Sequence, residues 1–426
     1  MVDHQNLENA HRFLRGSDAA EALRIISELH AAGFVAYMAG GCVRDALLGR
    51  QPKDYDVATD ATPDAIREVF GKRKTLAFGA SFGVIGVLPA KGGGAQTHEP
   101  TEVATFRSDG SYSDGRRPDS VHFGDAENDA QRRDFTINGL FYDPLSDQVI
   151  DYVGGVDDLK AGLLRTIGNP VERFAEDKLR MLRAVRFATT MALQIDHTTL
   201  EAVVHHASEI CVVSGERIGA EMRRVVTSPN LVQGLRHLQS CGLDQHVFPE
   251  LRSLDWKALD QINQQYPQRD FARSLAAMVS SLSEAKATPE RFVERWKLSN
   301  LEVRMADAAL KHWRTLSNAH VRPWSEVQPV LMDRDIETII WLADARVSVE
   351  QLDPSGVERS RQALAWPPHE LNPEPFLTGD DLRQLGVSPG PQLGQWLTRI
   401  RKAQLDGELK SREEAEKVLA QWRANP

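Results

Sequence analysis

The chain has 426 residues, of which 41% are hydrophobic and 26% are charged, and its formal net charge is −9 at pH 7. A chain of this length exceeds what one hydrophobic core supports, so we expect several domains of an ordinary folded protein. The negative net charge argues against a protein that coats nucleic acid by charge alone, although it leaves room for an RNA enzyme with local basic strips.

We expect no membrane association, because the N-terminus has no basic-then-apolar leader and no apolar run is long enough to cross a bilayer. The three cysteines, Cys42, Cys211 and Cys241, stand far apart, without the spacing of a zinc site or a disulfide framework. This cysteine usage fits a reducing compartment, and we expect a cytoplasmic protein.

The first part of the chain alternates between helical and strand-like patterns, which predicts an α+β domain. The expected elements are a helix over residues 17–32 that Gly33 ends, strands over residues 34–38, 55–58, 81–88 and 102–106, and a short helix that ends near Gly49. The glycine run at residues 92–94 reads as a flexible hairpin loop with no chemical role.

The rest of the chain is helical in pattern from Pro170 onward, and all eight tryptophans follow residue 250. Helices are expected over residues 174–191, 199–207 and 216–226, and prolines separate further helices after them. The proline-rich stretch at residues 366–375 reads as a linker into a last small domain. We therefore predict an α+β front followed by an all-α rear.

The strongest chemical signal is the run GGCVRDALLGRQPKDYDV, which begins at Gly40. Paired glycines after a strand let a phosphate chain approach the backbone closely, and the helix that follows points its N–H groups at the anion. Arg44 lies in the first turn of that helix, within reach of a triphosphate.

The same run ends on two carboxylates, Asp54 and Asp56, which are two residues apart on a predicted strand and so share a face. Two converging carboxylates are suited to hard Mg²⁺ ions, and Glu102 on another predicted strand would complete the cage. An Asp-x-Asp pair alone more often marks a solvated turn. The order of glycine pair, arginine and acidic pair favours a nucleotide and metal site.

With three later motifs, this run resembles the signature of the class II tRNA nucleotidyltransferase (CCA-adding enzyme) and bacterial poly(A) polymerase family, within the polymerase-β-like superfamily. The later motifs are RRDFTINGL from Arg132, EDKLRMLRAVRF from Glu176 and GERIGAEM from Gly215. The resemblance implies a polymerase-β-like catalytic head over residues 1–153, followed by an all-α neck at 154–255, body at 256–370 and tail at 371–426. The helical stretch at residues 256–366 shows no sharp motif.

The resemblance also implies which residues do the chemistry. Asp54 and Asp56 would bind the catalytic Mg²⁺ ions, with Glu102 as the third carboxylate of the catalytic set. One metal would activate the RNA 3′-hydroxyl, and the other would neutralise the departing pyrophosphate. The residues implied in nucleotide binding are Gly41, Arg44, Arg133, Asp134, Asp177, Arg180, Arg183 and Arg186.

In this family, the helix that carries Asp177 and Arg180 acts as a protein template for the incoming base. A carboxylate accepts from an exocyclic amine and an arginine donates to the adjacent ring nitrogen, an edge that cytosine and adenine share and that uracil and guanine lack. Arg183 and Arg186 are expected at phosphates, and Arg186 also fits a structural role. Without the upstream motifs, the three-residue steps of these charges would read as an exposed face of salt bridges.

Two peripheral segments favour a CCA-adding enzyme over its relatives. Residues 104–120 resemble the flexible loop of CCA-adding enzymes, in which Arg107, Arg116 and Arg117 would contact phosphates; the alternative is an ordinary surface loop. Residues 377–415 resemble the tail that grips the tRNA elbow; the alternative is plain helix-hairpin packing.

We therefore expect an enzyme that adds or repairs the 3′-terminal CCA of tRNA from CTP and ATP and releases pyrophosphate. The partners are then tRNA, ATP and CTP, with no membrane, and no particular oligomeric state is predicted. A bacterial poly(A) polymerase, or an A-adding or CC-adding specialist of the same family, is the alternative. A non-catalytic RNA-binding protein is disfavoured, because Asp54, Asp56 and Glu102 are all present.

Overall fold

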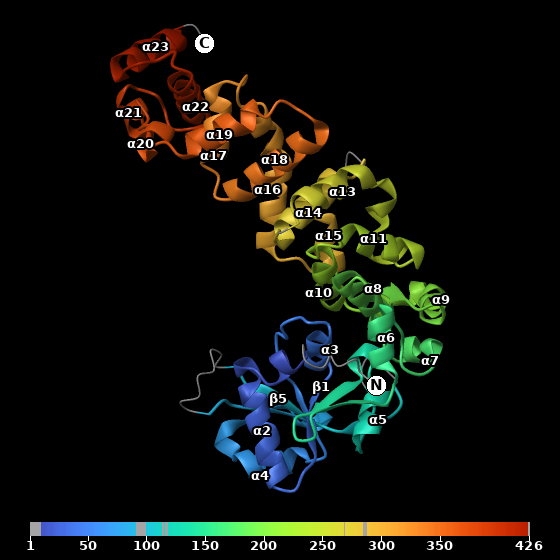
Figure 1. Ribbon diagram of the computed structural model, residues 1–426. Coiled ribbons are helices and arrows are strands. Elements are labelled where there is room, and N and C mark those ends of the chain that lie inside the picture. Colours follow the sequence, from blue (N-terminus) through green and yellow to red (C-terminus); the bar gives the residue numbers. More distant parts are fainter. Residues whose placement is uncertain are drawn as a thin grey trace. The chain divides into compact units, whose positions relative to one another are not determined.

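The computed structural model describes residues 10–90, 99–112, 115, 118–267, 269–283 and 288–424. Contacts within the chain divide it into two units (Figure 1). The first comprises Met1–Val225 and Gln233–Pro249, and the second comprises Val226–Val232 and Glu250–Pro426. The glycine run at 92–94, Arg116 and Arg117 lie outside the described residues. The finer division into head, neck, body and tail stays a prediction.

A seven-stranded mixed sheet, in the order β3-β4-β5-β2-β1-β8-β9, forms the centre of the first unit. Its strands are β1 Ala36–Ala39, β2 Val57–Thr59, β3 Thr75–Gly79, β4 Val84–Val87, β5 Thr101–Thr105, β8 Leu140–Asp143 and β9 Gln148–Asp151. β2 and β5 run parallel, and the other described neighbours in this sheet run antiparallel. The four strands expected from the sequence are present, with their ends shifted by up to three residues.

The two faces of this sheet are covered differently. On one face, α2 (Ala20–Ala31) and α4 (Pro63–Phe70) pack Ile26 and Ile66 into a core with Val57 and Val103. On the other face, the short helix α5 (Ala126–Gln131) packs against a smaller cluster that contains Ala58. Because successive strand residues point to opposite faces, the neighbours of Val57 and Val103 along the chain point toward this second face.

Helices and short strands complete the first unit. They are α3 Gly41–Leu47, the hairpin β6 Arg107–Asp109 with β7 Val121–Phe123, α6 Gly155–Ala161, α7 Pro170–Glu176, α8 Leu179–Met191, α9 His197–His206, α10 Gly215–Val226, α11 Leu231–Ser240, α12 Asp244–Val247, and the parallel pair β10 Leu163–Leu164 with β11 Gln194–Ile195. The last residue of α10, Val226, and the first two residues of α11 belong to the second unit.

The single helix expected over residues 174–191 is wrong, because the chain breaks at Asp177. This residue has extended backbone angles, φ −139° and ψ 107°, and it separates α7 from α8. Its carboxylate accepts the N–H of Leu179, the first residue of α8, at 3.1 Å. An aspartate that bonds its own following backbone competes with the helix, so it starts a new helix here and does not continue the old one.

The second unit is helical, as expected, and its described residues contain no strand. Its helices are α13 Trp256–Gln265, α14 Phe271–Ser280, α15 Arg291–Trp296, α16 Asn300–Ser317, α17 Trp324–Leu331, α18 Ile336–Glu350, α19 Ser355–Leu364, α20 Pro368–Leu371, α21 Gly379–Gln384, α22 Pro391–Leu405 and α23 Arg412–Ala424. The last three surround their own small core, which includes Leu382, Trp396, Ile400 and Leu419. None of the helices in the described ranges has the length and apolar character to cross a membrane.

Candidate active site

The pairing of β2 with β5 brings two of the predicted catalytic carboxylates together. Val57 pairs in parallel with Val103, and both side chains are buried against α2 and α4. The preceding residues, Asp56 and Glu102, therefore point to the other face, one strand apart. Asp56 also continues the pairing with β1, because its carbonyl accepts the N–H of Ala39 at 3.0 Å.

The carboxylates act on one another electrostatically. Burial, followed by the charges of Asp54 and Glu102, raises the pKa of Asp56 to about 7, and the nearby Arg133 only partly offsets this. Among the described residues, no three acidic, histidine or cysteine side chains are drawn together as metal ligands. The oxygen-only donors and the excess negative charge fit a hard divalent cation.

A tight glycine turn connects β1 to α3 beside these carboxylates. Gly40 has a φ of +68°, and a Cβ added there would lie 2.6 Å from Nη1 of Arg133. That guanidinium also donates to the Asn138 carbonyl at 3.1 Å and pairs with Asp129 at 2.8 Å. The turn therefore requires glycine for its backbone angle and for the passage of Arg133. The structure makes Gly40 the strained member of the pair, whereas Gly41 begins α3.

Buried polar contacts run from α3 toward α8. Arg44 donates through Nη1 to the side-chain oxygen of Asn138 at 2.5 Å, and its guanidinium lies over the Phe187 ring. Asn138 in turn donates to Asp134 at 2.8 Å. Asp134 accepts two bonds from Arg183, at 2.8 and 2.5 Å. These contacts give Asn138 a bridging role between Arg44 and Asp134.

The pKa of Asp134 is lowered despite its burial. Burial alone would raise the pKa of this carboxyl, but Arg183, the Asn138 amide and the Phe135 N–H hold it well below its usual range. A buried carboxylate with this many donors is a fixed anchor. Asp134 therefore sets the position of Arg183 on α8.

The predicted template charges are each held by a partner. Asp177 accepts from Arg217 at 2.8 Å, and Arg186 forms an ion pair with Glu221 at 2.6 Å. Burial lowers the pKa of Arg186 to about 10, which is consistent with a structural role. Arg180 donates to Glu176 at 2.6 Å and stacks near the Tyr112 ring, 5.9 Å from its centroid. These partners satisfy the charges within the protein. The charges therefore pair with other elements and not along α8.

Arg217 and Glu221 were not singled out from the sequence, although both lie in the GERIGAEM motif. They are four residues apart on α10, so they share one face of that helix. Arg217 holds Asp177, and Glu221 lies within 3.9 Å of Arg183 as well as holding Arg186. An opposite-charge pair at this spacing is the signal that would have pointed to them.

Within the segment expected to be a flexible loop, Arg107–Asp109 form β6, which pairs with β7 just beyond that segment. Arg107 is engaged within it, since it binds the carbonyl of Phe82 and pairs with Asp109 at 3.0 Å. Tyr112, whose ring lies near the Arg180 guanidinium, donates to the same Asp109 at 2.7 Å. This hydrogen bond links the hairpin to Arg180. The hairpin base is thus ordered by internal contacts.

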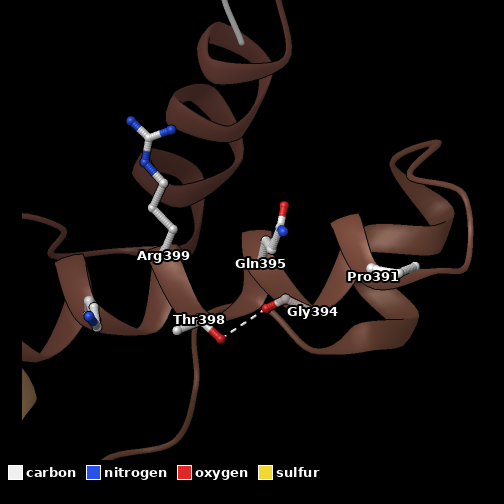
Figure 2. Close-up of a pocket in the computed structure, with 6 residues that line it drawn as sticks. Pro391, Gly394, Gln395, Thr398 and Arg399 are labelled. Carbon is white, nitrogen blue, oxygen red and sulfur yellow. Dashed lines mark hydrogen bonds between the residues drawn. The ribbon is translucent and has the colours of Figure 1, made fainter.

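In the second unit, one exposed face of α22 forms an open hollow (Figure 2). The residues that line it are Pro391, Gly394, Gln395, Thr398, Arg399 and Lys402. The Thr398 hydroxyl donates to the Gly394 carbonyl at 2.9 Å, and the Arg399 guanidinium lies 3.9 Å from the centre of the Trp422 ring. Arg399 and Lys402 supply two positive charges, and Gly394 has no side chain to cover the backbone. This surface is suited to phosphates.

Comparison with known families matches almost the whole chain. The Poly A polymerase head domain matches residues 36–165, the RNA and SrmB-binding site of polymerase A matches residues 192–254, and tRNA nucleotidyltransferase domain 2 matches residues 269–418. The last of these covers the helical stretch in which the sequence showed no sharp motif. The nucleotidyltransferase family usually uses a divalent metal.

Individual relatives agree with these families. The chain is 33% identical over 387 residues to the CCA-adding enzyme of Limosilactobacillus fermentum, which covers 90% of this chain and 92% of the relative. It is 32% identical to the CCA-adding enzyme of Enterococcus faecalis, over 92% and 93% of the two chains. The crystal structure of the Bacillus stearothermophilus CCA-adding enzyme in complex with CTP is 28% identical, covers 95% and 98% of the two chains, and superposes with a TM-score of 0.76. With the sheet, the glycine turn and the helical second unit all in agreement, this chain belongs to the CCA-adding enzyme family of tRNA nucleotidyltransferases.

Proposed function

We propose that this chain adds or repairs the 3′-terminal CCA of tRNA, using CTP and ATP and releasing pyrophosphate. One observation carries the proposal. The charge of Arg133 acts on Asp56, and Arg133 donates to the Asn138 carbonyl; Asn138 and Asp134 continue these contacts to Arg183 on α8. The names of the relatives favour CCA addition over the poly(A) polymerase alternative.

In the proposed site, Asp54 and Asp56 hold Mg²⁺ and Glu102 is the third carboxylate. The metal is assigned as Mg²⁺ because the donors are all carboxylate oxygens. When bound, it polarises the RNA 3′-hydroxyl and neutralises charge on the pyrophosphate. The raised pKa of Asp56 supports this assignment, because the neighbouring negative charges that contribute to it would be neutralised by a bound cation.

The nucleotide is held on the β1 and β8 side of the carboxylates. Gly41, Arg44 and Arg133 are assigned to the phosphates, because the Gly40 turn leaves the backbone open to them. Asp134 is assigned to the sugar of the nucleotide, where it acts through the side chains that it positions. Arg183 and Arg186 are assigned to the phosphates. Binding would exchange some of the protein partners of these arginines for phosphate oxygens.

The base is read by Asp177 and Arg180. Asp177 accepts from the exocyclic amine of cytosine or adenine, and Arg180 donates to the adjacent ring nitrogen. Arg217 and the N–H of Leu179 each donate to one oxygen of the Asp177 carboxylate, at 2.8 and 3.1 Å, which fixes its direction. A carboxylate held in this way rejects the carbonyl of uracil or guanine, because two acceptors would face each other. We also propose that the chain is divided into head, neck, body and tail domains, and that the protein is located in the cytoplasm.

The proposed function predicts where synthesis stops. Given tRNA that lacks its CCA end, CTP and ATP, the protein should add three nucleotides and then halt, which sequencing of the products would show. We assign the tail to bind the tRNA at a position distant from its 3′ end. Because that position is fixed, the growing 3′ end can reach the active site only up to a limited length. Long adenosine tails on unstructured RNA, with poor use of CTP, would instead identify a poly(A) polymerase.

The hairpin makes a separate prediction. Removing residues between Tyr112 and Ser120 should spare C addition and lower A addition about tenfold or more, because one pocket must adapt from a pyrimidine to a purine. Single-nucleotide incorporation on tRNA ending before the first C and before the A would measure both steps. An equal loss of the two steps would mean that the hairpin only supports the fold.

A further inference from the structure

An exposed aromatic ring lies on the acidic face of the sheet and has no part in the site described above. Phe78 on β3 is 58% exposed. Its ring lies over Gly86 on β4, where an added Cβ would be only 2.6 Å from the ring. Gly86 is the direct antiparallel partner of Glu102 on β5. Directly opposite residues share a face, so the ring stands on the same face as Glu102 and Asp56.

The position of this ring relative to the carboxylates follows from the strand order. The glycine turn, Arg133 and Asn138 lie beside β1 and β8, on one side of Asp56, whereas β4 and β3 lie beyond Glu102 on the other side. Neighbouring strands are about 4.8 Å apart, so a ring over Gly86 stands about one strand from Glu102. In-line phosphoryl transfer places the attacking hydroxyl and the leaving group on opposite sides of the α-phosphate. With the nucleotide on the β1 side, the attacking RNA end belongs over β5, β4 and β3.

A basic run lies at the same end of the sheet. The turn Lys72–Lys74 carries three consecutive cationic residues, all exposed, directly before β3. The Lys74 carbonyl accepts the N–H of Leu88 at 2.9 Å, which extends the pairing of β3 with β4 past the pair Thr75–Val87. Because β4 and β5 are antiparallel, this is the end at which Glu102 lies. An exposed aromatic ring and a basic run at one end of a sheet are the features of a surface for single-stranded nucleic acid.

We infer that Phe78 and the basic run Lys72–Lys74 form the seat for the 3′ end of the acceptor RNA. The ring stacks on the base of the terminal nucleotide, which places its 3′-hydroxyl at the carboxylates, and the cations bind the phosphates that precede it. Because Gly86 has no side chain, it leaves the space that the Phe78 ring occupies. Stacking accepts any base, which suits a site where the terminal base changes as the end grows. This inference rests on the proposed function and adds the subsite for the acceptor.

The decisive experiment combines a protein change with an RNA change. Phe78→Ala should raise the KM for tRNA about tenfold and leave the KM for CTP unchanged, because one stacking contact is lost. Phe78→Tyr should restore the KM for tRNA, whereas Phe78→Leu, which keeps apolar area without a ring, should not. Tyr152→Ala removes a ring of 41% exposure just after β9, at the opposite edge of the sheet, and should change neither constant.

The RNA change tests whether the ring meets a base. A tRNA whose terminal nucleotide lacks its base should lose about the same factor with the wild-type protein and nothing further with Phe78→Ala. Gly86→Ala should resemble Phe78→Ala, since its methyl group displaces the ring. Replacing all three of Lys72–Lys74 by alanine should reduce the slope of log affinity against log salt by about 2.

The outcomes separate this inference from the proposed function. An unchanged KM for tRNA in Phe78→Ala, or equal penalties for the abasic end in both proteins, would overturn the seat while wild-type CCA addition still stood. Failure of the wild-type protein to add C or A to tRNA would overturn the proposed function itself.

Discussion

Replacing Asp56 with asparagine should lower the rate of nucleotide addition about 10³-fold or more, because it removes a ligand of the metal that stabilises the transition state. The same change should preserve or raise the thermal stability of the metal-free protein. The folded-state pKa of Asp56, about 7, lies above its ordinary value of 3.8, so the ionised carboxylate opposes folding. In wild-type protein this group's contribution to stability is present at low pH and is lost as the pH rises toward 7.

Two measurements check this result. Incorporation of labelled CTP into tRNA gives the rate, and thermal unfolding in the presence of a chelator gives the stability at pH 5 and pH 8. Asp64→Asn, an exposed carboxylate on α4, is the matched control and should change neither quantity. Near-wild-type incorporation by the Asp56→Asn protein would remove the metal assignment.

Asp177→Asn should weaken the rejection of UTP relative to CTP about 100-fold, which is the second large effect expected. The amide has the shape of the carboxylate but adds a donor, and this donor can pair with the carbonyl of uracil. The single amide oxygen can keep the bond from Arg217 or the bond from the N–H of Leu179, and the break between α7 and α8 is expected to survive. The binding of tRNA should be unaffected, because the change is confined to the base edge.

The ratio of kcat/KM for all four nucleotides, measured beside tRNA affinity, is the test of base choice. Glu172→Gln, an exposed carboxylate on α7, is the control for a charge change near the same break in the chain. If the asparagine variant keeps the wild-type preference for C and A over U and G, the template assignment of Asp177 is incorrect.

Local sequence patterns predicted much of the first sheet and the members of its acidic face. The two-residue spacing of Asp54 and Asp56 predicted that they share a face, and the structure places both residues just before β2. The position of Glu102 depends on the parallel pairing of β2 with β5. That pairing joins segments more than 40 residues apart, and a local pattern of apolar residues does not encode it.

The contacts around the template could not be predicted from spacing. Asp134 and Arg183 are 49 residues apart, and their bond depends on how α8 packs beside the loop before β8. The break at Asp177 depends on a side chain that bonds its own backbone, a competition that helical periodicity does not reveal. In the second unit, the fit between α16 and α18 rests on side-chain volumes, so no short motif marks it.

The path of the chain between α10 and α11 has a practical consequence for isolating the catalytic part. The chain leaves the first unit at Val226, re-enters it at Gln233 and leaves again at Glu250, so no single cut separates the units. A protein shortened to end at Val225 would lose α11, whose Gly234 is packed so closely that an added Cβ would lie 2.6 Å from the Thr189 hydroxyl on α8. The back of the template helix would then face water. A soluble catalytic fragment should therefore extend to about Pro249.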